Sequence, residues 1–311
     1  MSRPALRCVR LVKRYGDVVA VNGLDLEVRA GECFGLLGPN GAGKTTTIEI
    51  LEGLVLHDEG EVEVLGQQWG RGNDRALRRR LGIQLQESQL GEKLTVFETL
   101  RLFRSFYPGG RRVEDVLALV ELESKRDSWV GKLSGGQRQR LSVGCALVGA
   151  PEVLFLDEPT TGLDPQSRRQ LWTLLDAFRR EGGTVLLTTH YMDEAETLCD
   201  RVAVVDLGKL IALGTPRELI ASLGAEHVIE FAVDAAAPAP PVPVLQALPG
   251  VIDARTEQDR VLLSASAVHL AVPALLAALD AAGARLSFLT THSATLEDVF
   301  VKLTGRHLRD A

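Results

Sequence analysis

The segment Gly38-Pro39-Asn40-Gly41-Ala42-Gly43-Lys44-Thr45 constrains the fold of this chain more than any other. It fits the phosphate-loop pattern GxxxxGK followed by Ser or Thr, and it lies between the apolar run Cys33–Leu37 and a helical pattern. Glycines let successive backbone N–H groups point at phosphate oxygens, Lys44 adds a positive charge, and Thr45 offers a hydroxyl ligand for Mg2+. We therefore expect a strand, a loop and a helix that together bind a phosphorylated ligand.

Short apolar runs alternate with helical patterns up to about Gly224. Val153–Leu156 and Thr184–Thr189 are further strand-like runs, and the helical stretch Gln166–Arg180 separates them. The pair Val202–Val205 and Leu210–Leu213 is typical of a hairpin. This alternation predicts an α/β fold with a mostly parallel core sheet, whose ligand-binding residues follow the strands at their carboxyl ends.

Two carboxylates, Asp157 and Glu158, end the apolar run Val153–Leu156. In a phosphate-binding site Asp157 would hold Mg2+ through water, and Glu158 would orient or deprotonate an attacking water. Acidic residues are also common where strands run into solvated loops. The pair therefore indicates a site only in combination with the phosphate loop.

The segment Leu133-Ser134-Gly135-Gly136-Gln137 stands before a helical run. Backbone N–H groups at a helix start can bind a γ-phosphate. With this segment the chain resembles the ABC ATPase family, whose signature is LSGGQ. The resemblance implies a helical subdomain, and it implies that Ser134, Gly135, Gly136 and Gln137 contact ATP held by a second copy of the chain. Two copies would then enclose two shared sites.

The rest of the ABC pattern is present in order from Val9 to about Gly214. The resemblance implies ATP and Mg2+ as cofactors and ATP hydrolysis as the reaction. It implies that Tyr15 and the loop from Gly38 to Thr46 bind ATP. Thr45, Gln86 and Asp157 would bind Mg2+, and Glu158, His190 and Gln86 would take part in hydrolysis. Asp164 would contact the second copy in the dimer. Gln84 is the weaker candidate for the role of Gln86. His190 would hold the γ-phosphate from the end of the strand Thr184–Thr189.

A second, smaller domain is expected in residues 225–311, after an ATPase domain in residues 1–224. The strand-like run Val228–Val233 precedes Asp234–Val244, which contains four prolines and is expected to form an extended loop without a helix. Two strand patterns, a helix and a further strand follow, up to Thr290. This order fits an α+β fold of the ferredoxin-like type.

Charge and hydropathy exclude some functions. The formal net charge of -6 and a pI near 5.6 do not favour nucleic acid as a partner. No apolar run reaches the roughly 18 residues of a membrane span, so we expect the chain not to enter a bilayer by itself. The four cysteines are scattered without a paired spacing, which favours free thiols.

The C-terminal residues resemble one particular group within the ABC family. Thr291–Phe300 and the residues up to Arg306 resemble the exporter ATPases of daunorubicin and doxorubicin resistance, which work with a separate membrane permease. This implies export of a small molecule, such as a drug, an antibiotic or a lipid-like compound, from the cytoplasmic face of a membrane. An importer ATPase with a regulatory C-terminal domain remains an alternative. A non-transport ABC ATPase is disfavoured, because the chain has one phosphate loop and only 90 residues separate Lys44 from Ser134 (134 - 44).

Overall fold

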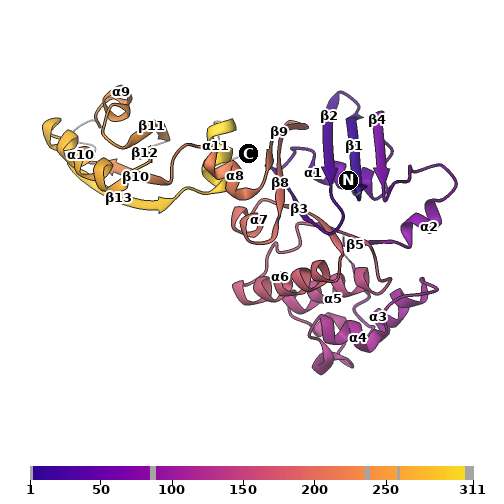
Figure 1. The fold of residues 1–311 in the computed structure, drawn as a ribbon. Coiled ribbons are helices and arrows are strands. Elements are labelled where there is room, and N and C mark those ends of the chain that lie inside the picture. The colour runs from indigo at the N-terminus through magenta and orange to yellow at the C-terminus, as the bar shows by residue number, and fades with distance from the viewer. Residues whose placement is uncertain (1–2, 85–88, 235–238, 258–259, 305–311) are drawn as a thin grey trace. The chain divides into compact units, whose positions relative to one another are not determined.

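The computed structural model describes residues 3–84, 89–234, 239–257 and 260–304 (Figure 1). The chain divides into two compact units, Met1–Thr215 and Pro216–Asp310. Among the residues described, the first unit contains a six-stranded sheet and a three-stranded sheet, and the second contains a four-stranded sheet.

The six-stranded sheet positions the site. Its first five strands are parallel, and the sixth is antiparallel to the fifth. In spatial order the strands are β5 (Leu81–Gln84), β6 (Val153–Asp157), β7 (Thr184–Thr189), β3 (Cys33–Leu37), β8 (Arg201–Asp206) and β9 (Lys209–Gly214). Every residue of β3, β6 and β7 is buried, which explains their continuous apolar runs. The predicted parallel core sheet and the hairpin of β8 and β9 are thus confirmed.

The three-stranded sheet is antiparallel, in the order β2 (Val18–Val28), β1 (Leu6–Tyr15) and β4 (Glu59–Val64). Both sheets pack on the helix α1 (Lys44–Leu51). One core includes Leu11 and Val21 of the small sheet, Ile48 of the helix, and Phe34 and Phe155 of the large sheet. The helix that follows the phosphate loop is therefore held between the two sheets.

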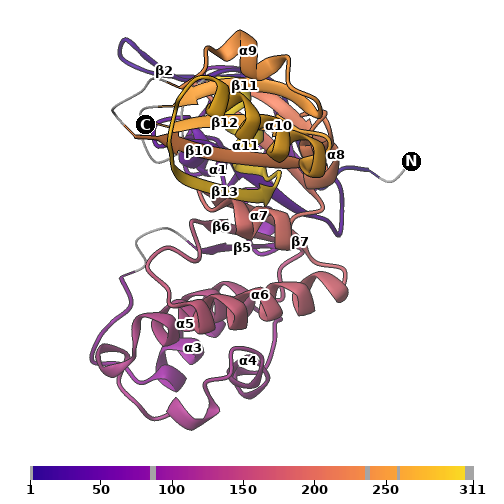
Figure 2. The ribbon, with the colours of Figure 1, turned by 90° about the vertical axis from the view of Figure 1, so that its left-hand side faces the viewer.

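The remaining described helices of the first unit include the expected helical subdomain and further helices that contact strands of the large sheet. They are α2 (Asp74–Arg78), α3 (Val96–Ser105), α4 (Val113–Leu119), α5 (Gly135–Leu147), α6 (Pro165–Arg180) and α7 (Met192–Leu198), with 3-10 turns at Glu123–Lys125 and Val130–Lys132. Figure 1 and Figure 2 both show α3 and α4 beside α5, and Figure 1 shows them on the side away from β1, β2 and β4.

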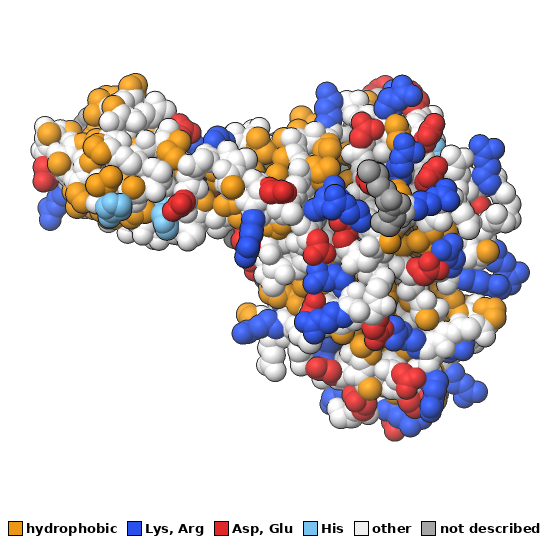
Figure 3. Space-filling view, viewed as in Figure 1, with side chains coloured by type: hydrophobic (Ala, Val, Ile, Leu, Met, Phe, Trp, Pro, Cys, Tyr) orange, Lys and Arg blue, Asp and Glu red, His pale blue; other side chains and the backbone are white. Residues whose placement is uncertain are grey.

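The surface of the first unit is mixed in charge. On the face that Figure 3 shows, Lys and Arg side chains are interspersed with Asp and Glu, and hydrophobic side chains lie between them. Such mixing is typical of a solvated protein surface. Among the described residues no helix is both long and apolar enough to cross a membrane.

The second unit has its own fold and core. Its elements are α8 (Pro216–Ala221), β10 (His227–Val233), α9 (Val242–Gln246), β11 (Val251–Glu257), β12 (Arg260–Ala265), α10 (Val268–Ala281), β13 (Leu286–Ser293) and α11 (Leu296–Thr304). The sheet order is β11-β12-β10-β13, with all neighbours antiparallel. Along the chain, the elements from β10 to β13 follow the order of the ferredoxin-like motif: strand, helix, two strands, helix and strand.

The proline-rich segment differs from the expectation at one end. The short helix α9 begins at Val242, inside the range Asp234–Val244 for which the sequence predicts no helix. Pro241 is its N-cap, and Pro243 lies in its first turn. Proline is tolerated there because the first N–H groups of a helix have no partner within the helix.

The division between the units falls nine residues before Gly224 (224 - 215). The helix α8 belongs to the second unit because it packs against α11, and the Lys302 ammonium donates a hydrogen bond to the carbonyl oxygen of Leu223 at 3.1 Å. We therefore propose Thr215 rather than Gly224 as the end of the ATPase domain.

Candidate active site

The phosphate loop joins β3 to α1, and its glycines are needed for steric reasons. Gly43 has a φ of 93°, and a Cβ at this position would lie 2.2 Å from the carbonyl oxygen of Ala20. A Cβ on Gly38 would lie 2.2 Å from the carbonyl oxygen of Val205. Only glycine allows the backbone to approach its neighbours so closely.

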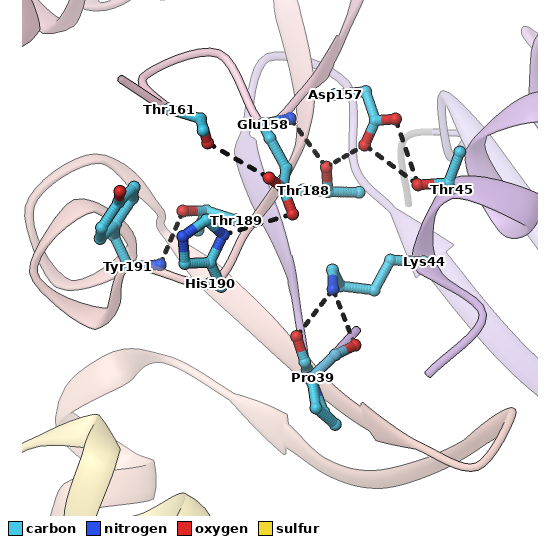
Figure 4. A network of polar contacts seen from close by, with 11 residues as sticks. Pro39, Lys44, Thr45, Asp157, Glu158, Thr161, Thr188, Thr189, His190 and Tyr191 are labelled. Atoms are coloured by element: carbon cyan, nitrogen blue, oxygen red, sulfur yellow. Dashed lines mark hydrogen bonds and ion pairs between the residues drawn. The ribbon is translucent and has the colours of Figure 1, made fainter. Parts of the chain in front are cut away.

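Lys44 lies across this loop. Its ammonium donates hydrogen bonds to the carbonyl oxygens of Gly38 at 2.7 Å and Pro39 at 2.9 Å (Figure 4). The side chain is buried, and burial lowers its pKa, while the nearby carboxylates of Glu158 and Asp157 act in the opposite direction. Since an ammonium has three donors, one remains for a phosphate oxygen.

Asp157 ends β6, opposite Thr188 on the parallel strand β7. The Thr45 hydroxyl donates to its Oδ2 at 3.1 Å, and the Thr188 hydroxyl donates to its Oδ1 (Figure 4). A carboxylate and a hydroxyl are hard oxygen ligands. They fit Mg2+, which usually binds one or two protein groups and completes its coordination with water and substrate phosphates.

Glu158 follows Asp157 in an uncommon backbone conformation, with a φ of 47°. Its N–H donates to the hydroxyl oxygen of Thr188 at 3.0 Å. Its Oε1 lies 3.3 Å from Nδ1 of His190, and its Oε2 accepts a hydrogen bond from the Thr161 hydroxyl at 3.2 Å (Figure 4). A non-glycine residue in this region typically costs about 1–3 kcal/mol and is found most often at functional sites.

The imidazole of His190 contacts the ring of Tyr191 as well as the carboxylate of Glu158. Its ring centroid lies 4.2 Å from that of Tyr191, and the guanidinium of Arg168 lies 4.5 Å from the Tyr191 ring. The Tyr191 N–H donates to the Thr189 hydroxyl at 2.9 Å. The last residues of β7 therefore turn the histidine toward Glu158.

The signature segment forms the start of α5. Ser134 is the N-cap: its hydroxyl accepts from the Gln137 N–H at 3.3 Å, and its own N–H donates to Oε1 of Gln137 at 3.1 Å. Ser134 and Gly135 are exposed, whereas Gly136 is buried. The capped helix start leaves Gly135 exposed, and backbone N–H groups at a helix start are what an anion site needs.

Asp164 is the N-cap of α6. Its carboxylate accepts hydrogen bonds from the N–H groups of Gln166 and Ser167, each at 3.0 Å, and from the Ser167 hydroxyl at 2.6 Å. The Ser167 hydroxyl contributes most to lowering the pKa of Asp164. A structural role is thus observed for Asp164, and the dimer contact remains a prediction.

The other predicted residues have diverse environments. Tyr15 ends β1 with 48% of its surface exposed, and the Lys13 ammonium lies 5.2 Å from its ring centroid. Asn40 and Gly41 are exposed, whereas Ala42 is buried. Gln86 lies outside the described residues, and Gln84 is buried at the end of β5.

Sequence reasoning missed Thr188 and Thr161. Thr188 bonds to both Asp157 and Glu158, and Thr161 bonds to the Glu158 carboxylate. Thr188 could have been found from the sequence, because it is a polar residue at the carboxyl end of the apolar run Val185-Leu186-Leu187. The second lies three residues after Glu158, and no pattern marked it.

A strand, a glycine loop and a helix, with two acids at the carboxyl end of another parallel strand of the same sheet, define a phosphate-loop nucleotide-binding domain. A family model described as "ABC transporter" matches residues 21–161. A second model, described as "AAA domain, putative AbiEii toxin, Type IV TA system", matches residues 131–192.

Relatives match almost the whole chain. "Nod factor export ATP-binding protein I" of Ralstonia nicotianae is 40% identical over 99% of this chain and 96% of the relative. "Linearmycin resistance ATP-binding protein LnrL" of Bacillus subtilis is 37% identical over 98% of this chain and all of the relative. The chain belongs to the ATP-binding subunits of ABC transporters and is an ATPase.

Solved structures match the fold of most of the chain. "Structure of ATP binding subunit of ABC transporter" superposes with a TM-score of 0.64 at 29% identity, over 71% of this chain and 93% of the other. "Dimeric Structure of MJ0796, a Bacterial ABC Transporter Cassette" has a TM-score of 0.61 at 26% identity, over 68% of this chain and 98% of the other. The ATPase fold is therefore that of solved ABC cassettes.

Proposed function

We propose that this chain hydrolyses ATP to power export of a small molecule through a separate membrane permease. The observation that carries the proposal is the meeting of Lys44, Asp157, Glu158 and His190 at the carboxyl edge of β3, β6 and β7 (Figure 4). A cation for phosphate, a carboxylate for a metal and a carboxylate beside an imidazole are the groups that phosphoryl transfer to water requires.

Each residue has a distinct task in this reaction. Lys44 and the loop N–H groups bind the β- and γ-phosphates, and Thr45 and Asp157 would hold Mg2+, which neutralises charge on the phosphate oxygens. The Glu158 carboxylate orients the attacking water and accepts its proton. The imidazole of His190, 3.3 Å from Glu158, binds the γ-phosphate oxygen and keeps the carboxylate directed at the water.

The complete site takes a second copy of the chain. Ser134 and Gly135 are exposed at the start of α5, where N–H groups can bind a γ-phosphate held by a partner. The similar bacterial cassette MJ0796 has a dimeric structure, which supports this arrangement. Two copies would enclose two ATP molecules, and hydrolysis would release them from each other.

Export is the direction that the relatives favour. One is named for Nod factor export and another for linearmycin resistance, and the tail Thr291–Phe300 resembles the daunorubicin and doxorubicin exporters. The helix α3 carries the exposed Leu102, followed by the exposed Phe106, which suits a contact with a permease at the cytoplasmic face of a membrane.

Glu158→Gln tests the proposed reaction. The amide keeps the size of the side chain but cannot take a proton, so ATP hydrolysis should fall by at least about 100-fold while ATP still binds. The ATP-bound variant should accumulate as a dimer in size-exclusion chromatography. Glu123→Gln is the control, because Glu123 is an exposed glutamate that is distant from Glu158 in the sequence.

Two outcomes would contradict the proposal. Full turnover by Glu158→Gln would remove this residue from the reaction. If the ATPase activity of a purified complex responded to a membrane protein that imports its substrate, the ATPase assignment would stand and the proposed direction of transport would be wrong.

A further inference from the structure

Thr188 makes two hydrogen bonds at the site and had no role assigned from the sequence. It is fully buried, and it lies opposite Asp157 in the parallel register of β6 and β7. Its hydroxyl donates to the Asp157 carboxylate and accepts from the Glu158 N–H at 3.0 Å. One hydroxyl therefore uses its donor on one residue and its acceptor on the next (Figure 4).

The acceptor side holds the backbone of Glu158. The φ of 47° is unfavourable for a glutamate, so neighbouring groups must maintain it. Because the partner of its N–H lies on a neighbouring strand, this bond sets the direction in which the Glu158 side chain leaves the sheet. From there the carboxylate reaches His190 at 3.3 Å and the Thr161 hydroxyl at 3.2 Å.

The donor side holds the carboxylate of Asp157. Thr188 donates to Oδ1 and Thr45 donates to Oδ2, so the two hydroxyls bracket the group. Such outer partners orient metal-binding carboxylates, and their loss commonly costs about 10- to 100-fold in activity or metal affinity.

We propose that Thr188 is a positioning residue for ATP hydrolysis, because its single hydroxyl fixes the Asp157 carboxylate and the Glu158 backbone relative to each other. It acts through these two residues and does not itself contact ATP. The inference rests on the roles proposed above for Asp157 and Glu158.

Thr188→Val is the direct test, since valine has the same shape and lacks the hydroxyl. We expect kcat for ATP hydrolysis to fall about 10- to 100-fold, with KM for ATP within about twofold, because Lys44 and the loop are unchanged. Thr188→Ser retains the hydroxyl and should keep kcat within about threefold of the parent. Thr188→Ala is a second hydroxyl-free variant, should valine fold poorly.

Thr184→Val is the matched control on the same strand. Thr184 is buried, and its hydroxyl accepts one hydrogen bond, from the Gly31 N–H at 2.9 Å, at the opposite end of β7. Its loss should lower the melting temperature by a similar amount and leave kcat unchanged. A structural role alone would make the two valine variants alike, whereas the proposal separates them by kcat.

Glu158→Gln, measured alongside, distinguishes failure of the inference on Thr188 from failure of the proposed function. If Glu158→Gln abolishes turnover while Thr188→Val matches Thr184→Val, the inference on Thr188 is overturned and the proposed function stands. Full turnover by Glu158→Gln would overturn both. A loss of kcat in Thr188→Val and Thr188→Ala, with recovery in Thr188→Ser, supports both.

Discussion

Glu52 follows the phosphate-loop helix and is a buried carboxylic acid. It is 1% exposed, and neither carboxylate oxygen has a hydrogen-bond partner among the described residues. Burial raises its pKa from 4.5 to about 8, and the carboxylates of Asp157 and Glu49 add to the effect. The folded protein therefore holds this group protonated at neutral pH, whereas the unfolded chain ionises it.

This pKa predicts a pH dependence of stability. The contribution of Glu52 to folding is fully present below about pH 4.5 and is lost as the pH rises toward about 8, because the unfolded state releases the proton first. Glu52→Gln, which stays neutral, should remove this loss and gain about 3–5 kcal/mol relative to the parent between pH 5 and pH 9. Urea unfolding at the two pH values measures it.

An exposed glutamate is the control for this effect. Glu61→Gln, on β4, should leave the difference between pH 5 and pH 9 as it is in the parent protein. Equal pH dependence in the Glu52→Gln variant and the parent would show that Glu52 is not held neutral in the folded state.

At the scale of elements, the packing of α5 on α6 depends on Gly136. A Cβ at Gly136 would lie 2.2 Å from the Ser167 hydroxyl oxygen and 2.6 Å from its Cβ. Ser167 cannot move freely, because its hydroxyl and its N–H both bond to Asp164. The start of the signature helix and the start of α6 are thus fitted to each other.

Gly136→Ala should lower the free energy of unfolding by about 1–3 kcal/mol, because the added methyl group must displace Ser167. Gly135→Ala is the matched variant one residue earlier, where a Cβ would meet nothing within 4 Å. It should leave stability unchanged or raise it by up to about 1 kcal/mol, since alanine favours a helix. Denaturant unfolding measures the stability of both variants. Equal stability of Gly136→Ala and Gly135→Ala would contradict the proposed packing of Gly136 against Ser167.

At the scale of the whole molecule, the second unit has a core of its own. Ile229 and Phe231 of β10, Leu263 of β12 and Leu275 of α10 are fully buried in one cluster. Burial of such side chains contributes roughly 1.5–3 kcal/mol each. We therefore expect the unit to fold independently and not as an extension of the ATPase.

Truncation after Thr215 tests this division. The fragment 1–215 should bind ATP and melt within about 4 °C of the parent, because only residues without a nucleotide-binding role are lost. Export should nevertheless be weakened. Truncation after Gly224 is the comparison: it keeps α8 without α11, so the buried Leu219 and Leu223 would be exposed and the fragment should aggregate more readily. Loss of ATP binding by a folded 1–215 fragment would place the functional boundary elsewhere.

Local patterns in the sequence determined much of this protein. The phosphate loop, the apolar strands before it and before Asp157, and the Ser134 cap of α5 could all be predicted. Each rests on residues that are close together in the chain, where backbone geometry and helix capping act directly. The family resemblance added roles for Tyr15, Asp164 and His190 that the structure does not test.

The tertiary structure alone decided how distant residues meet. Thr188 reaches Asp157 across 31 positions because β6 and β7 pair in one particular register, and a shift of that register would separate them. Glu52 is likewise buried only in the folded protein, at the end of a helix that packs between the two sheets. Such partners are set by packing between elements, whereas a sequence pattern records only the preferences of each element by itself.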